Sequence, residues 1–152
     1  MTGTIAHFEE LLKTVPQRLA DVADEAAAHK PGGDRWSKKE ILGHLIDSAA
    51  NNHQRFVRAQ SAGRLEFPGY EQEFWVATQS YATESWADLV NLWLLLNRHL
   101  LHVVKAMPGA MWSHECVIGG RPAVTLEALI IDYLRHLDQH LAQLLGQLRT
   151  AK

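Results

Sequence analysis

The sequence is poor in cysteine, and this excludes a whole class of small disulfide-stapled proteins. Cys116 is the single cysteine among 152 residues, so no disulfide can form within the chain, and a reducing compartment is the natural setting. Long apolar runs are missing too, since the most apolar segment, LVNLWLLL, is far too short to span a bilayer. The first residues, MTGTIAHFEE, do not resemble a secretory signal. We therefore expect a cytoplasmic protein.

An excess of basic charge is also absent. The formal net charge is −2 and the isoelectric point is near 6.5, so the chain has no strong positive field to attract nucleic acid. An apolar content of 47% and a charged content of 21% are typical of a globular domain. No repeat, linker or low-complexity tract divides the chain. We predict one domain over residues 1–152 that binds neither nucleic acid nor membrane.

Several catalytic signatures are missing as well. The sequence has no H-E-x-x-H, no C-x-x-C, no phosphate-binding glycine loop, no dinucleotide fingerprint and no Glu-x-x-His of the di-iron bundles. Asp138 lies between His136 and His140 in the sequence, but on a helix it projects away from them. It is therefore not a general base of the metalloprotease type. Cys116 is predicted to be a buried structural thiol.

Apolar residues recur at helical spacing in four long segments. We expect the first to kink or restart at Pro16, and the second to begin with the capping box Ser37-Lys38-Lys39-Glu40. The segments are Thr4 to Ala28, Lys38 to Ser61, Ser85 to Pro108 and Thr125 to Arg149. A short helix near 71–79 and a small hairpin within 108–124 are also expected, with no other convincing strand. The pattern predicts an all-α four-helix bundle.

Two histidines, His136 and His140, lie four residues apart in the last predicted helix. They project from one helix face about one turn apart, a spacing that can present two imidazoles to one metal ion. Both flank the apolar stripe of Leu126, Ile130, Leu137, Leu141, Leu144 and Leu148. His44 flanks the stripe of the second helix in the same way. Three neutral histidines from two facing helices would leave a coordination position open, which is typical of catalytic zinc sites.

The spacing also admits other interpretations. A histidine pair at the border of a helix stripe can simply be solvated. His99 and His102, three residues apart in the third long helix, are a rival pair that we expect mostly at the surface. The remaining histidines have no partner at ligand spacing and are expected at the surface: His7, His29, His53 and His114.

A polar line follows His44 along the second long helix. Ser48, Asn51 and Arg55 come at offsets of four, seven and eleven residues, on nearly the same side as His44, and predict the wall of a cleft. Arg55 is a candidate for binding an anionic group of a substrate, with a salt bridge at the bundle edge as the alternative. Asp47 is a candidate to orient a ligand imidazole, unless it faces solvent.

Two longer strings carry a resemblance to a known family. They are WSKKEILGHLIDSAANNHQRF, residues 36–56, and TLEALIIDYLRHLDQHLAQL, residues 125–144. A Trp-Ser entry, His-Leu-x-Asp, and H-x-x-x-H with Gln-Leu, in this order, look like the DinB-like superfamily of small bacterial metal-binding bundles. The resemblance covers nearly the whole chain. It implies an up-down-down-up bundle with one divalent metal ion, often zinc or nickel, and it matches His44, His136 and His140 to the family's ligands.

The resemblance implies a kind of chemistry without naming the substrate. Characterised relatives include metal-dependent thiol S-transferases and thiol-dependent isomerases that use low-molecular-weight thiols, although no residue here matches a thiol-specific subset. We expect a thiol S-transferase whose open metal position binds a thiolate. The alternatives are a metal-dependent hydrolase that uses a bound water, and a non-catalytic metal-binding or interaction module.

The third long helix predicts self-association. Its expected core stripe is Leu89, Leu92, Trp93, Leu96, Leu100 and Val103. Val90, Leu94 and Leu101 form a second apolar strip on another side, where a monomer would normally place polar groups. This strip is a candidate interface, and we expect a homodimer. The alternative is that segment 63–84 covers the strip.

Overall fold

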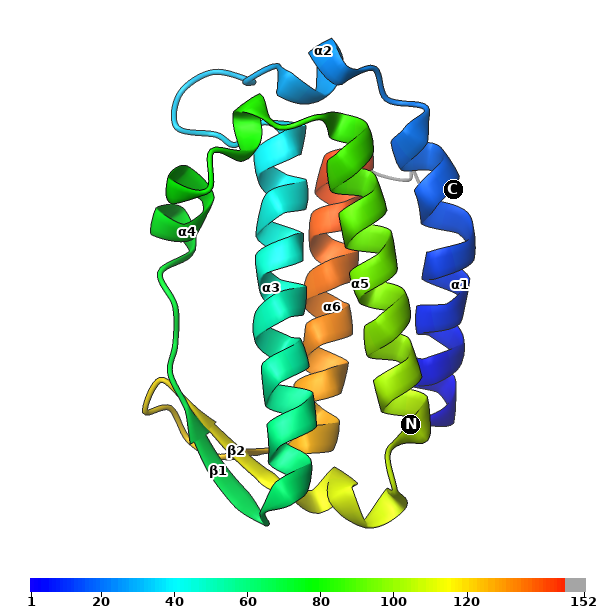
Figure 1. Ribbon diagram of the computed structural model, residues 1–152, viewed down its shortest axis with the longest axis vertical. Coiled ribbons are helices and arrows are strands. Elements are labelled where there is room, and N and C mark those ends of the chain that lie inside the picture. The colour runs from blue at the N-terminus through cyan, green and yellow to red at the C-terminus, as the bar shows by residue number, and fades with distance from the viewer. Residues whose placement is uncertain (147–152) are drawn as a thin grey trace, which may run out of the picture.

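The fold, taken from a computed structural model, is a bundle of four long helices. The structure describes residues 1–146. The long helices are α1 (Thr2–Ala20), α3 (Lys38–Arg58), α5 (Trp86–Ala106) and α6 (Leu126–Leu145). In Figure 1, α1 and α6 run in one direction while α3 and α5 run in the other. This up-down-down-up order confirms the predicted all-α four-helix bundle.

Each long helix packs on two others. α3 and α1 both contact α5 and α6, so the four helices enclose one core. Because each helix buries one apolar stripe, side chains from all four meet along the bundle axis. The fully buried large side chains include Phe8, Leu19, Leu42, Leu45, Phe56, Trp93, Leu100, Ile130 and Leu137. The two helices that carry the predicted metal ligands, α3 and α6, are therefore direct neighbours.

A long crossover joins α3 to α5. Since these two helices run in the same direction, the chain must return along the outside of the bundle between them, and Figure 1 shows it doing so. The return path is built from η1 (Ala59–Ser61), β1 (Arg64–Phe67), α4 (Gln72–Thr78) and η2 (Tyr81–Thr83). α4 confirms the short helix predicted near 71–79, and it packs on α3.

A small sheet lies at one end of the bundle. β2 (Glu115–Ile118) follows η3 (Gly109–Ser113) and pairs antiparallel with β3 (Val124–Thr125), which confirms the predicted hairpin. Gly119 and Gly120 turn the chain with φ angles of 59° and 72°, a conformation that glycine adopts readily. The third strand, β1, pairs parallel with β2. The expectation of no further strand was wrong, because β1 is short and its partner lies far along the chain.

The first predicted helix needs a correction. α1 continues through Pro16 and ends at Ala20, and α2 (Asp24–Ala28) is a separate short helix. A proline inside a helix removes one backbone hydrogen bond, and here the surrounding bonds and packing outweigh that loss. The helix breaks after Ala20 instead, which allows α2 to cross the end of the bundle. There Asp24 Oδ2 accepts a hydrogen bond from the buried Lys39 Nζ at 2.9 Å.

The predicted core stripe of α5 is rotated in the structure. Leu89, Trp93 and Leu100 are buried as expected, but Leu92 is 46% exposed and Val90 is buried. The reason is that α5 packs on both α1 and α3, so its buried arc is centred between these two neighbours. Val90 therefore belongs to the core, and the second apolar strip was assigned wrongly at that residue.

The last helix follows its predicted stripe as far as the structure describes it. Leu126, Ile130, Leu137, Leu141 and Leu144 are all buried. The stripe residue Leu148 and the predicted helix end at Arg149 lie outside the described residues. Within residues 1–146, no helix combines the length and the apolar character needed to cross a membrane.

Candidate metal centre

Capping interactions set the positions of the two histidine-bearing helices. Ser37 Oγ accepts a hydrogen bond from the Glu40 amide at 3.3 Å, and Glu40 Oε2 accepts one from the Ser37 amide at 2.8 Å. This capping box starts α3 at Lys38 and confirms the prediction. At the start of α6, Thr125 Oγ1 accepts a hydrogen bond from the Ala128 amide at 3.1 Å, which caps the helix at its predicted start.

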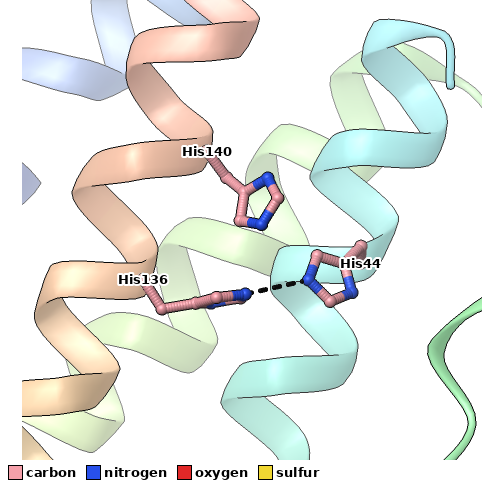
Figure 2. A group of neighbouring side chains, drawn as sticks. All are labelled: His44, His136 and His140. Carbon is pink, nitrogen blue, oxygen red and sulfur yellow. Dashed lines mark hydrogen bonds between the residues drawn. The ribbon is translucent and has the colours of Figure 1, made fainter. Parts of the chain in front are cut away.

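The three predicted ligands converge between α3 and α6. One nitrogen from each of His44, His136 and His140 can be chosen so that all three lie within 4.8 Å of one another. Figure 2 shows His136 and His140 projecting from neighbouring turns of α6 toward His44 on α3. The ring centroids are 4.5 to 5.0 Å apart. His44 is fully buried, whereas His136 and His140 are half-buried and retain access to solvent.

The imidazoles are arranged to bind a cation in their neutral form. Burial lowers the pKa of His44 to about 4, and the charges of His136 and His140 act in the same direction. Burial also lowers the pKa of His136, with His140 adding to the effect. Both rings are therefore neutral at pH 7, and each neutral ring keeps one lone pair for a metal.

The hydrogen bonds indicate which nitrogens face the centre. Nε2 of His44 and Nε2 of His136 lie 3.0 Å apart, while Nδ1 of each ring is buried and has no partner in the described part of the chain. His140 Nδ1 lies 3.2 Å from Gln143 Oε1, which leaves its Nε2 free for a ligand role. Within residues 1–146, no carboxylate or thiol joins the cluster. Three neutral imidazoles with no fourth protein ligand fit a divalent ion with an open position.

Trp36 forms a wall of the histidine cluster. Its position there was not predicted from the sequence. Its ring centroid lies 5.1 Å from that of His44, with the two planes tilted by 44°. Its indole N–H donates a hydrogen bond to Glu73 Oε2 of α4 at 3.2 Å. The crossover is thus attached to the residue that precedes the capping box. The signal for Trp36 in the sequence is the Trp-Ser pair of the family pattern.

Asp47 is buried one turn after His44, but its partners differ from those expected. Its Oδ1 accepts hydrogen bonds from the Tyr81 hydroxyl and from Gln79 Nε2, both at 2.7 Å. Burial raises the pKa of Asp47, and these two hydrogen bonds oppose that rise. No direct hydrogen bond links it to the three imidazoles in residues 1–146. Its visible role is to hold the crossover against α3.

A cavity of about 860 Å³ opens beside the cluster. His136 lines it, together with Ser48, Asn52 and Arg55 from α3. The predicted cleft wall is therefore present, with one exchange of residues. Asn51 Nδ2 bonds back to the Asp47 carbonyl at 2.9 Å, and Asn52 takes its place in the wall. Cys116 also lines the cavity and is fully buried, as predicted for a structural thiol.

The remaining histidines lie away from the centre. His99 and His102 are exposed on α5, and the ring of His99 lies 5.2 Å from that of the half-buried His53. His7 is exposed and pairs with Asp138, whose carboxylate lies 2.9 Å from its Nε2. His29 is exposed, whereas the half-buried His114 has its Nδ1 2.7 Å from the Ala59 carbonyl. The prediction that His53 and His114 lie at the surface was only partly right, because both are half-buried.

The fold and the cluster together define a class: a four-helix bundle with crossed connections and a three-histidine centre suited to a divalent metal ion. Comparison with known proteins assigns the family. The sequence pattern of the DinB superfamily matches residues 7–144, and the chain belongs to that superfamily. A search of curated proteins gave no match.

A solved structure shares this architecture. YfiT from Bacillus subtilis is 18% identical in sequence and superimposes with a TM-score of 0.77, over 92% of this chain and 83% of that one. That protein is described as "a probable metal-dependent hydrolase with an unusual four-helix bundle topology". At this identity the similarity establishes the fold alone.

Proposed function

We propose that this protein is a metal-dependent hydrolase of small molecules. The observation that carries the proposal is the convergence of three histidines beside a cavity that one of them lines, with no fourth ligand among the residues that the structure describes. A structural zinc site is normally closed by four protein ligands, whereas a catalytic site keeps one position open. The description of YfiT as a probable metal-dependent hydrolase gives independent support from a similar fold.

In the proposed reaction, some residues of this chain would bind the ion and others would bind the substrate. His44, His136 and His140 would bind the ion, which, when bound, lowers the pKa of a coordinated water towards 7. His136 borders the cavity, so the ion would be held at the edge of the space that a substrate could enter. Hydrolysis of an amide adds the oxygen of water to the carbonyl carbon and breaks the C–N bond. The products are a carboxylate and an ammonium ion.

Thiol S-transfer is the second candidate, and the size of the cavity favours it. About 860 Å³ is enough space for a small thiol and an electrophile together. In this reaction the thiol sulfur bonds to an electrophilic carbon, a halide leaves that carbon, and the thiol proton passes to solvent. Cys116 is buried, and burial raises the pKa of its thiol, so the reacting thiol would come from a second substrate. Zinc or nickel as the native ion and a cytoplasmic location stay predictions.

One assay distinguishes the two reactions. Protein loaded with zinc or nickel, and the same protein stripped by a chelator, are given simple esters and amides without thiol. They are then given a thiol with a halogenated aromatic compound or an epoxide. A hydrolase is expected to turn over the first set only, and an S-transferase the second set only.

Matched variants complete the assay. His136→Ala is expected to abolish turnover, whereas His99→Ala, at an exposed histidine of α5, should leave it unchanged. Turnover that is insensitive to the metal and to His136→Ala would contradict both reactions. No turnover with any substrate would favour a non-catalytic metal-binding module.

A further inference from the structure

Arg55 is a buried cation without an acidic partner in the described part of the chain. Its side chain lies in the cavity wall and is only 8% exposed. No ion pair joins it to a carboxylate in residues 1–146. It donates two long hydrogen bonds, from Nη1 to Asn52 Oδ1 at 3.4 Å and from Nη2 to the Pro68 carbonyl at 3.5 Å. A guanidinium has five N–H donors, so most of its donor capacity is left for a ligand.

Leaving this charge unpaired has an energetic cost. A buried charge is tolerated in proteins when it is paired and hydrogen-bonded, and a desolvated arginine without an acid is an unusual arrangement. The salt bridge at the bundle edge, which was the alternative interpretation from the sequence, is not formed within residues 1–146. The guanidinium fork matches a carboxylate with two parallel hydrogen bonds. An anionic ligand from outside the chain would supply the negatively charged partner that Arg55 lacks among residues 1–146.

The charges around the cavity favour a carboxylate over a phosphate. Arg55 is the one buried charged side chain among the described residues that line the cavity. The other charged lining residues are exposed and carry one positive and two negative charges: Arg121, Glu71 and Asp132. A dianionic phosphate would bring two negative charges to a single buried cation, close to two acidic side chains. A carboxylate brings one negative charge, which the single positive charge of Arg55 matches.

The position of Arg55 adds a constraint on length. His44 and Arg55 lie eleven residues apart on α3, which places them on nearly the same side and separates their Cα atoms by roughly 16 Å along the axis. Ser48 and Asn52 line the stretch between them. The side chains cover part of this separation, and a molecule held by Arg55 must span the rest to reach the histidine centre.

We propose that this protein acts on elongated small molecules with a carboxylate at one end, which Arg55 binds, and the reacting carbonyl at the other end. Asn52 serves as a positioning residue, because its Oδ1 accepts from Arg55 while its Nδ2 donates to the Ser48 carbonyl at 2.9 Å. The inference rests on the proposed function for the reaction, but the carboxylate site itself exists without the metal and is tested without it.

Calorimetric titration of metal-free protein tests the site directly. The probes are hexanoate, its neutral analogue hexanamide, and inorganic phosphate. Wild-type protein is expected to bind hexanoate at least about tenfold more tightly than hexanamide or phosphate. Arg55→Met, which keeps length and removes charge, should lose this preference, and Arg55→Lys should keep part of it. Arg121→Met is the matched control, since Arg121 is an exposed arginine of the same cavity, and it should change hexanoate affinity less than about twofold.

The contrary outcomes are equally specific. Equal affinity for hexanoate and hexanamide in the wild-type protein would overturn the proposal, as would tighter binding of phosphate. Undiminished hexanoate binding in folded Arg55→Met would overturn the role of Arg55. If Arg55→Met does not fold, Arg55→Lys and the wild-type comparison decide the question.

A kinetic test addresses length. For metal-loaded protein, monomethyl suberate is expected to be hydrolysed with a higher kcat/KM than monomethyl malonate, and Arg55→Lys should raise KM more than it lowers kcat. The reverse order of the two esters would overturn the elongated substrate. Failure of every ester would instead count against hydrolysis, while hexanoate binding would still decide the role of Arg55.

Discussion

The aromatic ring of Tyr81 lies directly against the backbone of Gly43. A Cβ atom at position 43 would overlap the ring, so only glycine admits this contact. From this position the Tyr81 hydroxyl donates a hydrogen bond to Asp47 Oδ1 at 2.7 Å. The crossover is thereby clamped to α3 within one turn of His44. A residue without a side chain thus determines how closely the crossover segment packs on α3 beside His44.

Gly43→Ala is expected to destabilise the protein by up to about 2 kcal/mol. Alanine favours a helix over glycine by about 1 kcal/mol, but the overlap with Tyr81 forces overpacking that costs more. Urea unfolding measures the difference. Gly3→Ala is the matched control, because a Cβ there meets nothing within 4 Å, and it should be neutral or slightly stabilising. An unchanged unfolding midpoint for Gly43→Ala would show that Tyr81 can move away freely.

Purified protein is expected to bind one divalent ion per chain. His136→Ala and His140→Ala should each abolish this binding, because two imidazoles hold an ion far more weakly than three. His99→Ala should bind a full equivalent. Elemental analysis of protein purified without a histidine tag measures the stoichiometry. Loss of the ion in His99→Ala with retention in His140→Ala would show that the site assignment is wrong.

Trp36 is expected to report on ion binding. Its ring centroid lies 5.1 Å from that of His44, close enough for bound nickel to quench the indole fluorescence. Nickel titration should therefore lower the emission of the wild-type protein in a saturable way. Trp36→Phe should remove most of this change while keeping the ion, and Trp112→Phe is the control for the other tryptophans. Equal quenching in Trp36→Phe would place the ion elsewhere.

The metal-free protein is expected to gain stability as the pH rises from about 4 to 6.5. The pKa of His44 is lowered by burial from 6.5 to about 4, so in this window the unfolded chain binds a proton that the folded chain does not. This contribution is present above pH 6.5 and is lost as the pH falls towards 4. Its size is up to about 3 kcal/mol.

Urea unfolding at several pH values checks this dependence. His44→Gln removes the titrating group and should show a flatter curve between pH 4 and 6.5. His29→Gln, at an exposed histidine, should behave like the wild-type protein. A slope that persists undiminished in His44→Gln would mean that other groups cause it.

A homodimer stays a prediction, now with a corrected surface. Leu92 and Leu95 of α5 are 46% and 63% exposed, three residues apart on one helix. Light scattering at micromolar concentration should give twice the chain mass of 17.1 kDa. Leu95→Glu is expected to give a monomer, whereas Phe74→Glu, at an exposed aromatic residue of α4, should not. A monomeric wild-type protein would contradict the prediction.

Local features of this protein could be predicted because their causes lie within a few residues. The N-cap residues Ser37 and Thr125 accept hydrogen bonds from amides three residues away, and both helix starts were found where expected. The spacing of His136 and His140 places them on one face of any α-helix. The stripe of α6 follows from the same periodicity. His44 was a candidate partner from its place beside the apolar stripe of its own helix, and the family resemblance supported joining it to the pair, since spacing within one helix says nothing about another.

Tertiary packing decided the rest, because it depends on which distant surfaces meet. The parallel pairing of β1 with β2 joins Leu65 to Cys116, and no local pattern encodes that partner. The rotation of the α5 stripe towards Val90 follows from having two neighbours, α1 and α3. Asp47 turned to Tyr81 because the crossover brought a hydroxyl to it. Helix periodicity is set by short backbone hydrogen bonds, whereas these contacts arise only when segments far apart in the chain exclude water together.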